Sequence, residues 1–256
     1  MQSSDRTIRV VIPARFGSQR LPAKPLVDLA GKPMIVRVFE AVRAGLGNED
    51  IVVAVDDDRI MRVLDEHEVP ATMTSPTCAS GTDRVAEVSR IRRWDSDDVV
   101  INVQGDEPLL PPDLLAAFAD FCSKRDDFTM ATIAVPVKEL HEISDPNVVK
   151  LAVRGDGTAI TFSRAPIPFD RDHDPSAWDT KNYRRHIGIY AYRNDVLQRL
   201  TATPQCALER IESLEQLRAL WLNIAIHVMD WDVAPPGGVD TPEDVARVTT
   251  HLMSRS

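Results

Sequence analysis

Arg15, Arg20 and Lys24 lie close together in residues 13–26, a stretch that holds too much Pro and Gly to form one helix. No Asp or Glu occurs from residue 6 to residue 27, so positive charge is concentrated in this stretch. Guanidinium and ammonium groups on one bent loop can converge on a small polyanion, because charge-assisted hydrogen bonds to phosphate are short and strong. The spacing predicts a binding loop for a nucleoside triphosphate. The alternative is a solvated basic loop, the commoner environment of Arg and Lys.

The charge of the whole chain limits the class of partner. Its formal net charge is −9 over 256 residues, which argues against a sequence-independent nucleic-acid binder and a polybasic membrane anchor. No run approaches the ~18 consecutive apolar residues of a membrane span, and residues 1–15 lack the apolar core of a signal peptide. Cys78, Cys122 and Cys206 fit neither a disulfide framework nor a zinc site. We therefore expect a cytoplasmic protein whose anionic partner is small.

The elements that must position the loop follow an alternating pattern. Apolar β-branched runs, which suit strands buried on both faces, recur between segments with helical periodicity. The expected strands are residues 8–14, 51–55, 98–103 and 130–137, and the expected helices are residues 31–45, 58–68, 81–93 and 111–125. Pro33 suits the first turn of the first helix and Gly45 suits its end. This alternation predicts an α/β fold, with a mostly parallel sheet covered by helices on both faces.

The pattern changes after Val137. Gly155-Asp156-Gly157 separates two alternating runs, which is typical of an antiparallel hairpin. Residues 169–185 are polar and irregular, and residues 207–222 have the periodicity of one amphipathic helix. We interpret the chain as a single domain, residues 1–256, with an antiparallel insertion at approximately 138–200.

In open α/β sheets, ligands bind beyond the carboxyl ends of the strands, so the segments after Ile12, Val55 and Val103 are where a site is expected. Neither GxGxxG nor a P-loop occurs in the sequence. The stretch NVQGDEP (102–108) delivers Gln104 and Asp106 to the sheet edge. A carboxylate beside bound phosphates is a natural ligand for Mg²⁺. The alternative for Asp106 is an ordinary turn residue after a strand.

Two predicted helix starts can each be explained in two ways. The stretch SGTDR (80–84) begins a helix whose backbone N–H groups could contact a ring or a phosphate, although Arg84 could instead pair with Glu87 on its own helix. In GVDTPED (238–244), Asp240 could be a ligand or only the N-cap of a helix. The two roles need not exclude each other if Thr241 supplies the cap. Taken alone, these residues favour the cap.

Together, these motifs resemble one family. PARFGSQRLPAKPL (13–26) is similar to the phosphate-binding signature of the sugar-activating cytidylyltransferases, and more narrowly to the 3-deoxy-manno-octulosonate cytidylyltransferases, which make CMP-Kdo. The matching stretches SGTDRVAEV (80–88), VINVQGDEP (100–108), FSRAPIPFDR (162–171), RHIGIYAYR (185–193), LEQLRALW (214–221) and GVDTPED (238–244) follow in the family's order. The resemblance covers essentially the whole chain. It implies a three-layer α/β/α nucleotidyltransferase (Rossmann-like) fold with a mixed, mostly parallel sheet, and transfer of CMP from CTP to Kdo for lipopolysaccharide synthesis.

The resemblance also implies a role for each matching residue. The catalytic residues would be Arg15, Lys24, Asp106 and Asp240, and the two acids would hold Mg²⁺. The nucleotide would be bound by Pro13, Ala14, Arg15, Arg20, Lys24, Ser80, Gly81, Arg84 and Asp106. The sugar acid would be bound by Gln104, Arg164, His186, Tyr190, Glu215 and Gln216. The alternative to sugar binding is a purely structural role for His186. For Glu215 and Gln216, the alternative is a position on the polar surface of a helix. A homodimer is expected, partly because residues 169–185 are long and polar and include Trp178 and Tyr183.

Three positions depart from the family's pattern. Ala23 stands where relatives commonly carry Gly, so we expect a negative φ there or slight strain of roughly 1 kcal/mol. Cys78 and Arg210 occupy places where His is frequent. These departures leave the sugar acid open, with an 8-amino relative of Kdo or a sialic acid as alternatives. A non-catalytic nucleotide-binding module is the alternative from another class.

Overall fold

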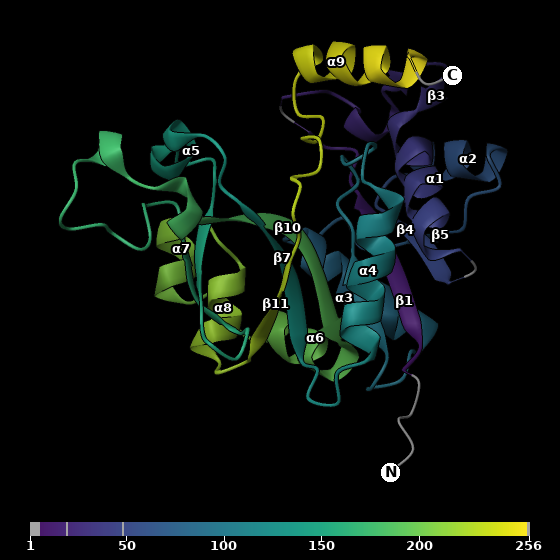
Figure 1. The fold of residues 1–256 in the computed structure, drawn as a ribbon. Helices are drawn as coiled ribbons and strands as arrows, with labels where there is room; N and C mark the ends of the chain where they lie inside the picture. The colour runs from purple at the N-terminus through teal and green to yellow at the C-terminus, as the bar shows by residue number, and fades with distance from the viewer. Residues whose placement is uncertain (1–5, 19, 48, 255–256) are drawn as a thin grey trace. The chain divides into compact units, whose positions relative to one another are not determined.

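The computed structural model describes residues 6–18, 20–47 and 49–254, so the first five residues of the N-terminal segment considered above lie outside it. By its internal contacts, the chain divides into two compact units (Figure 1). Unit 1 comprises Met1–Lys124 and Pro235–Ser256, and unit 2 comprises Arg125–Ala234. The predicted insertion at 138–200 lies inside unit 2, which extends beyond it at both ends.

Unit 1 is built on a parallel sheet. Its strands run in the order β6 (Val99–Asn102), β1 (Ile8–Ala14), β4 (Asp50–Val55) and β5 (Ala71–Met73). The register pairs Ala14 with Val55, and Val11 with Asn102, so the carboxyl ends of three strands lie at one edge. The central strands are buried, as their uninterrupted β-branched runs require. A short antiparallel ribbon of β2 (Asp28–Leu29) and β3 (Lys32–Pro33) follows the loop after β1.

Helices cover the sheet of unit 1, among them α1 (Met34–Leu46) and α4 (Pro112–Ser123), which pack against each other, and α3 (Gly81–Arg92), which packs against β1. Helices α2 (Asp58–Glu66) and α9 (Pro242–Met253) complete the unit, and η1 (Lys24–Leu26) is a single 3₁₀ turn. Gly45 does not end α1 as the sequence suggested. A Cβ there would lie 2.5 Å from the Pro112 carbonyl oxygen, so Gly45 permits close packing on α4, and Gly47 at φ 64° ends the helix.

Unit 2 holds the antiparallel hairpin that the sequence predicts, together with antiparallel pairs of β10 that it did not predict. Strand β10 (Arg184–Arg193) pairs antiparallel with β7 (Met130–Pro136) and β8 (Lys150–Val153), and β11 (Ile226–Asp230) pairs parallel with β7. Strands β8 and β9 (Ala159–Ser163) form the predicted hairpin, whose turn includes Gly157 at φ 83°. The remaining elements are α5 (Leu140–Ser144), η2 (Pro175–Ala177), η3 (Thr180–Asn182), α6 (Asn194–Thr201), α7 (Ala207–Glu212) and α8 (Gln216–Trp221).

The single helix predicted over residues 207–222 is wrong, because the chain forms α7 and α8 with a break at Ser213. Ser213 is left-handed, at φ 52°, and ends α7. The Glu212 carboxylate accepts hydrogen bonds from Ser163 Oγ at 2.7 Å and from the Arg164 backbone N–H at 3.0 Å. These tertiary bonds fix the end of α7, which amphipathic periodicity alone cannot reveal.

The irregular segment at 169–185 has its own small core. Trp178 and Tyr183 are buried in a cluster with Val137 and Ile143, so these two aromatic rings are covered within one chain. Phe169, by contrast, is 70% exposed. In the described parts of the chain, no helix combines the length and apolarity that crossing a membrane demands.

Candidate active site

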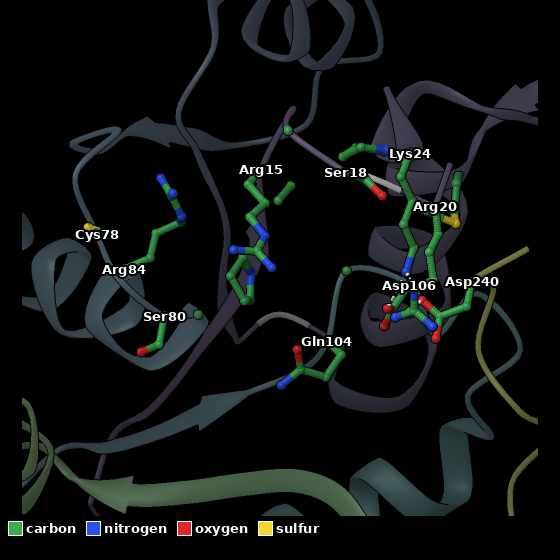
Figure 2. Close-up of a pocket in the computed structure, with 17 residues that line it drawn as sticks. Arg15, Ser18, Arg20, Lys24, Cys78, Ser80, Arg84, Gln104, Asp106 and Asp240 are labelled. Atoms are coloured by element: carbon green, nitrogen blue, oxygen red, sulfur yellow. Dashed lines mark hydrogen bonds and ion pairs between the residues drawn. The ribbon is translucent and has the colours of Figure 1, made fainter. Parts of the chain in front are cut away.

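A cavity of about 690 Å³ opens in unit 1 where β1 and β6 end and α3 begins (Figure 2). This volume is ordinary for a small-molecule site. Every residue of unit 1 that the sequence analysis assigned to a site lines it, namely Pro13, Ala14, Arg15, Arg20, Lys24, Ser80, Gly81, Arg84, Gln104, Asp106 and Asp240. Sequence analysis assigned no site role to Gly17, Ser18, Pro25, Met34, Cys78 and Gly105, which also line it.

Two carboxylates of the cavity converge on one cation. The ammonium nitrogen of Lys24 lies 2.6 Å from Asp106 Oδ2 and 2.8 Å from Asp240 Oδ1. Arg20 reaches the same Asp240 oxygen at 3.2 Å from a largely exposed position. Figure 2 shows these four side chains gathered in one group, with Arg15 in view between them and the start of α3. The loop, the end of β6 and the segment before α9 thus meet at one point.

Two glycines allow this meeting. A Cβ on Gly105 would lie 2.5 Å from the Pro13 carbonyl oxygen, and a Cβ on Gly238 would lie 2.8 Å from the Asp106 carbonyl oxygen. That same Asp106 oxygen accepts the backbone N–H of Val239 at 2.8 Å. Only glycine lets the backbones approach this closely, so both positions contribute to placing Asp106 and Asp240 together.

The two explanations of Asp240 are now separated. Thr241 is the N-cap of α9, and its hydroxyl accepts the Asp244 backbone N–H while the Asp244 carboxylate accepts the Thr241 N–H. This capping box satisfies the helix start without the side chain of Asp240. The Asp240 carboxylate is instead directed to Lys24 and Arg20.

The ionisation of Lys24 reflects its two partners. Burial alone lowers the pKa of an ammonium group. The negative charge of Asp106 and the hydrogen bonds to Asp106 and Asp240 outweigh burial, so the pKa of Lys24 is raised. Lys24 therefore remains a full cation at neutral pH.

Ala23, directly before Lys24, adopts φ 52° and ψ 35°. The sequence analysis expected either a negative φ or slight strain at Ala23. The negative φ is wrong, and the left-handed backbone is strained for an alanine. A left-handed alanine costs roughly 1 kcal/mol or more, because its Cβ crowds the following carbonyl. The loop accepts this strain where it turns Lys24 toward the two acids.

At the start of α3, Ser80 is the N-cap and forms a capping box with Asp83. Arg84 does not pair with Glu87, the alternative considered above. Its guanidinium bonds to Asp56 Oδ2 at 3.0 Å and to Thr74 Oγ1 at 2.5 Å. These partners fix the side chain of Arg84 at the cavity wall.

Glu87 has other partners. Its carboxylate accepts the Ser75 backbone N–H and the Cys78 thiol, which lies 2.9 Å from Oε2. Burial, followed by the hydrogen bond to Glu87 and its charge, raises the pKa of Cys78 to about 11. Cys78 is therefore a protonated thiol in the cavity wall.

The acid pair suits a hard divalent cation. No group of three or more His, Cys, Asp and Glu residues positioned for a metal occurs in the described ranges of the chain. Asp106 and Asp240, however, already bring carboxylate oxygens within hydrogen-bond distance of one positive centre, the Lys24 ammonium. Mg²⁺ uses one or two carboxylates together with phosphate oxygens and water. The donors present fit that ion when a phosphate ligand shares it.

In unit 2, the predicted residue His186 lies on β10 with its ring next to that of Tyr190, at a centroid distance of 5.3 Å. His186 Nε2 is 3.0 Å from Thr132 Oγ1, and that hydroxyl is also 2.9 Å from the Ile189 carbonyl oxygen. A hydroxyl that donates to a carbonyl accepts from Nε2–H, so we assign the lone pair of His186 to Nδ1. Desolvation lowers the pKa of His186 to about 3 and raises that of Tyr190.

Arg164, directly after β9, is held by backbone carbonyls. Its Nε donates to the Glu212 oxygen and its Nη1 to the Pro146 oxygen, both at 2.7 Å. The guanidinium has five N–H groups, so some remain for a ligand. Gln216 is buried, and its Nε2 has no hydrogen-bond partner among the described residues. Glu215 is electrostatically coupled to Tyr190, which places three of the predicted sugar-acid residues, including His186, near one another.

Two residues with clear roles in these contacts were missed. Thr132 is fully buried and holds His186, and its hydroxyl in an apolar strand was the available signal. Asp56, which holds Arg84, directly follows a buried strand. The strand-end rule pointed to the segment after Val55 but did not select a residue within it.

Comparison with known proteins identifies the family. The cytidylyltransferase family model matches residues 9–226. The chain belongs to the cytidylyltransferase family. The resemblance found in the sequence motifs is thereby confirmed.

The chain is similar along its length to proteins named as 3-deoxy-manno-octulosonate cytidylyltransferases. It is 58% identical over 251 residues to 3-deoxy-manno-octulosonate cytidylyltransferase 2 of Paraburkholderia phytofirmans, covering 98% of this chain and 95% of that protein. It is 47% identical over 247 residues to 3-deoxy-manno-octulosonate cytidylyltransferase of Polynucleobacter necessarius subsp. necessarius, covering 96% of both chains.

A solved structure of CMP:2-keto-3-deoxy-manno-octonic acid synthetase complexed with CTP matches with a TM-score of 0.89 and 36% identity, over 98% of this chain and 100% of that one. The α/β nucleotidyltransferase fold predicted from the sequence, with its mostly parallel mixed sheet, is confirmed.

We predict that His186 stays neutral, as the Nε2–H tautomer, from pH 8 down to pH 5, because desolvation holds its pKa near 3. Histidine in the unfolded chain titrates near its ordinary value of about 6.5. Below that pH the unfolded state binds a proton that the folded state does not, so His186 lowers folding stability as pH falls. Heteronuclear NMR of the ring nitrogens, with His186→Asn for assignment, measures this. A ring that titrates between pH 6 and 7 would contradict it.

Proposed function

We propose that this chain is a nucleotidyltransferase that transfers CMP from CTP to the anomeric 2-hydroxyl of Kdo and releases diphosphate. The product, CMP-Kdo, is the activated sugar for lipopolysaccharide synthesis. The observation that carries the proposal is the cavity in which Arg15, Arg20 and Lys24 accompany Asp106 and Asp240, in a family member with 58% identity to a named enzyme of this activity.

The cationic loop binds the triphosphate in this proposal. Arg15 is exposed at the cavity, and Arg20 and Lys24 are the other cations of the loop. The sugar hydroxyl attacks the α-phosphorus in line, and these three side chains stabilise the negative charge that builds on the departing diphosphate. The N–H groups at the start of α3, with Arg84, bind the nucleoside side.

Charge at the cavity supports a requirement for Mg²⁺. The lining residues Arg15, Arg20, Lys24 and Arg84, against Asp106 and Asp240, leave a net charge of about +2, while a nucleoside triphosphate brings roughly −4. Asp106 and Asp240 would hold the ion, and a bound Mg²⁺ would neutralise phosphate oxygens and lower the pKa of a coordinated hydroxyl. Lys24 would then exchange its carboxylate partners for phosphate.

Recognition of the sugar acid is assigned to Gln104 in unit 1 and to a set in unit 2. His186 Nδ1 is an acceptor for a sugar hydroxyl, and Tyr190 is a neutral phenol that can donate or accept. The remaining N–H groups of Arg164 suit a carboxylate. The buried Nε2 of Gln216 is a donor that still lacks a partner among the described residues, and Glu215 is an acceptor. A sialic acid or an 8-amino sugar would need a different match to these groups.

We place the reaction in the cytoplasm. The state of the cysteines supports this, because Cys78, Cys122 and Cys206 carry thiols rather than disulfides, as in a reducing compartment.

The first prediction of the proposed function concerns substrate choice. Diphosphate release should require both CTP and Kdo, and replacing CTP by ATP or GTP, or Kdo by a sialic acid, should reduce the rate at least a hundredfold. A panel of four nucleotides and three sugar acids, including 8-amino-Kdo, measures this in a coupled diphosphate assay. Equal rates with purine nucleotides would contradict the assignment to CTP. If no pair of nucleotide and sugar acid released diphosphate, the chain would be a non-catalytic nucleotide-binding module instead.

The second prediction concerns Asp240→Asn. Thr241 already caps α9 and the Asp240 side chain is 45% exposed, so losing this charge should weaken the bridge to Lys24 by about 1 kcal/mol or less and lower the melting temperature by only a few degrees. Turnover should instead fall by orders of magnitude, and CTP should still bind. Thr241→Ala is the matched control. It should cost about 1 kcal/mol of stability through the lost cap and leave turnover nearly intact. Near-normal turnover of Asp240→Asn at millimolar Mg²⁺ would remove Asp240 from the metal site.

The third prediction is a homodimer. Trp178 and Tyr183 are buried within one chain and so cannot supply its interface. Exposed apolar side chains remain on α7 and α8 of unit 2, with Ile211 79% exposed and Trp221 63% exposed. Surfaces of this kind are commonly covered in an oligomer. Light scattering should give twice the chain mass of 28.5 kDa, and Ile211→Glu should shift the mass toward the monomer. A fully active wild-type monomer would contradict this.

A further inference from the structure

Asp56 is the first residue after β4, and its two carboxylate oxygens have separate partners. Oδ1 accepts the backbone N–H of Phe16 at 2.9 Å, and Oδ2 accepts Arg84 Nη2 at 3.0 Å. Phe16 directly follows Arg15 at the start of the cationic loop, whereas Arg84 belongs to α3. Asp56 itself is not among the residues that line the cavity, although Arg15 and Arg84 both are. The Asp56 carboxylate therefore connects the cationic loop, next to Arg15, with Arg84 on α3, although Asp56 itself does not line the cavity.

The parallel register puts Asp56 in this place. Ala14 at the end of β1 pairs with Val55 at the end of β4, so the residues after each strand emerge side by side. The ion pair with Arg84 is largely buried, with the Arg84 side chain only 3% exposed. A short side chain held in such a pair has little freedom, and its second oxygen is fixed with it.

Residues at the start of α2, which follows Asp56, hold the side chain of Phe16. The guanidinium of Arg59 lies 3.5 Å from the centre of the Phe16 ring. Asp57, the N-cap of α2, binds that guanidinium through both carboxylate oxygens, at 2.8 and 2.6 Å. Phe16 is thus held by its backbone through Asp56 and by its ring through Arg59.

Charge and position make opposite predictions for Asp56. Its negative charge offsets that of Arg84, so removing it would make the cavity more positive and would favour an anion. If Asp56 instead matters because it aims the donors beside Arg15 and on Arg84, removing it would weaken an anionic ligand. The sign of the change in affinity separates the two.

We propose that Asp56 is a positioning residue for the nucleotide, which locks the start of the cationic loop and Arg84 into one arrangement and so couples the phosphate and nucleoside ends of the cavity. The inference rests on the proposed function, because it takes CTP as the ligand of this cavity.

The test is Asp56→Asn. An amide cannot accept from both the Phe16 N–H and Arg84, because one of its two ends carries hydrogens. Titration calorimetry with CTP at fixed millimolar Mg²⁺ should show a dissociation constant raised about tenfold to a hundredfold. Displacement titrations with CMP and with inorganic triphosphate should each show weaker binding, because both ends lose their fixed donors. Unchanged or tighter CTP binding, or weakening confined to one of the two fragments, would overturn the proposal.

Asp98→Asn is the matched control. Asp98 also pairs with an arginine, Arg9, at 3.0 Å and is 6% exposed, but it lies at the amino end of the same sheet, before β6. It should lose stability in the same way and bind all three ligands as the wild type does.

Asp56→Glu covers the case in which Asp56→Asn does not fold. Asp56→Glu keeps the charge beside Arg84, so it should fold. Because the longer side chain displaces the carboxylate, the variant should bind CMP and triphosphate several-fold more weakly than the wild type does. Wild-type binding of all three ligands by Asp56→Glu would also overturn the proposal. These binding measurements do not depend on turnover, so a wild-type protein that binds CTP but makes no CMP-Kdo would refute the proposed reaction alone.

Discussion

The arrangement of unit 1 depends on a single ammonium group between two carboxylates. Without the cation of Lys24, Asp106 and Asp240 would repel each other at the distances that the backbone imposes. The bridge joins segments that are 82 and 216 positions apart in sequence, and the second of these reaches unit 1 only after the chain has completed unit 2. The backbone bond from Val239 to Asp106 supports the same junction. The contacts of Asp106 with Lys24 and Val239, and of Asp240 with Lys24, thus join the C-terminal segment to the rest of unit 1 and also form the candidate site.

Much of this fold follows from local rules. The runs at 8–14 and 51–55 are β-branched without interruption, and they became β1 and β4 with bounds that differ by one residue at most. The Gly-Asp-Gly turn gave its hairpin. Residues that follow β1 and β6, such as Arg15 and Asp106, share one cavity because parallel strands end at one edge, a rule that needs no knowledge of side-chain contacts. The residues at the start of α3 and Asp240 were assigned from the family resemblance instead, and they line the same cavity. Their chemical roles remain predictions.

What the sequence could not supply depends on distant partners. Gly45 looked like a helix end, but its use is set by Pro112 on another helix. The break at Ser213 follows from Glu212 binding residues of β9 and after it. Arg84 has a plausible partner three residues along its own helix and pairs with Asp56 instead, 28 positions away. Ala23 has a left-handed conformation that its residue type disfavours, so tertiary contacts determine it.

Cys78 shows how the wall of this cavity is protected chemically. Burial, and after it the hydrogen bond to Glu87 and its charge, keep the proton on the sulfur, because they raise the pKa of the thiol to about 11. Oxidants and electrophiles attack the thiolate rather than the thiol. A carboxylate that elsewhere in the site would attract a metal here renders a sulfur inert, and the cavity can carry cysteine among its lining residues without becoming a target for peroxide or alkylating metabolites.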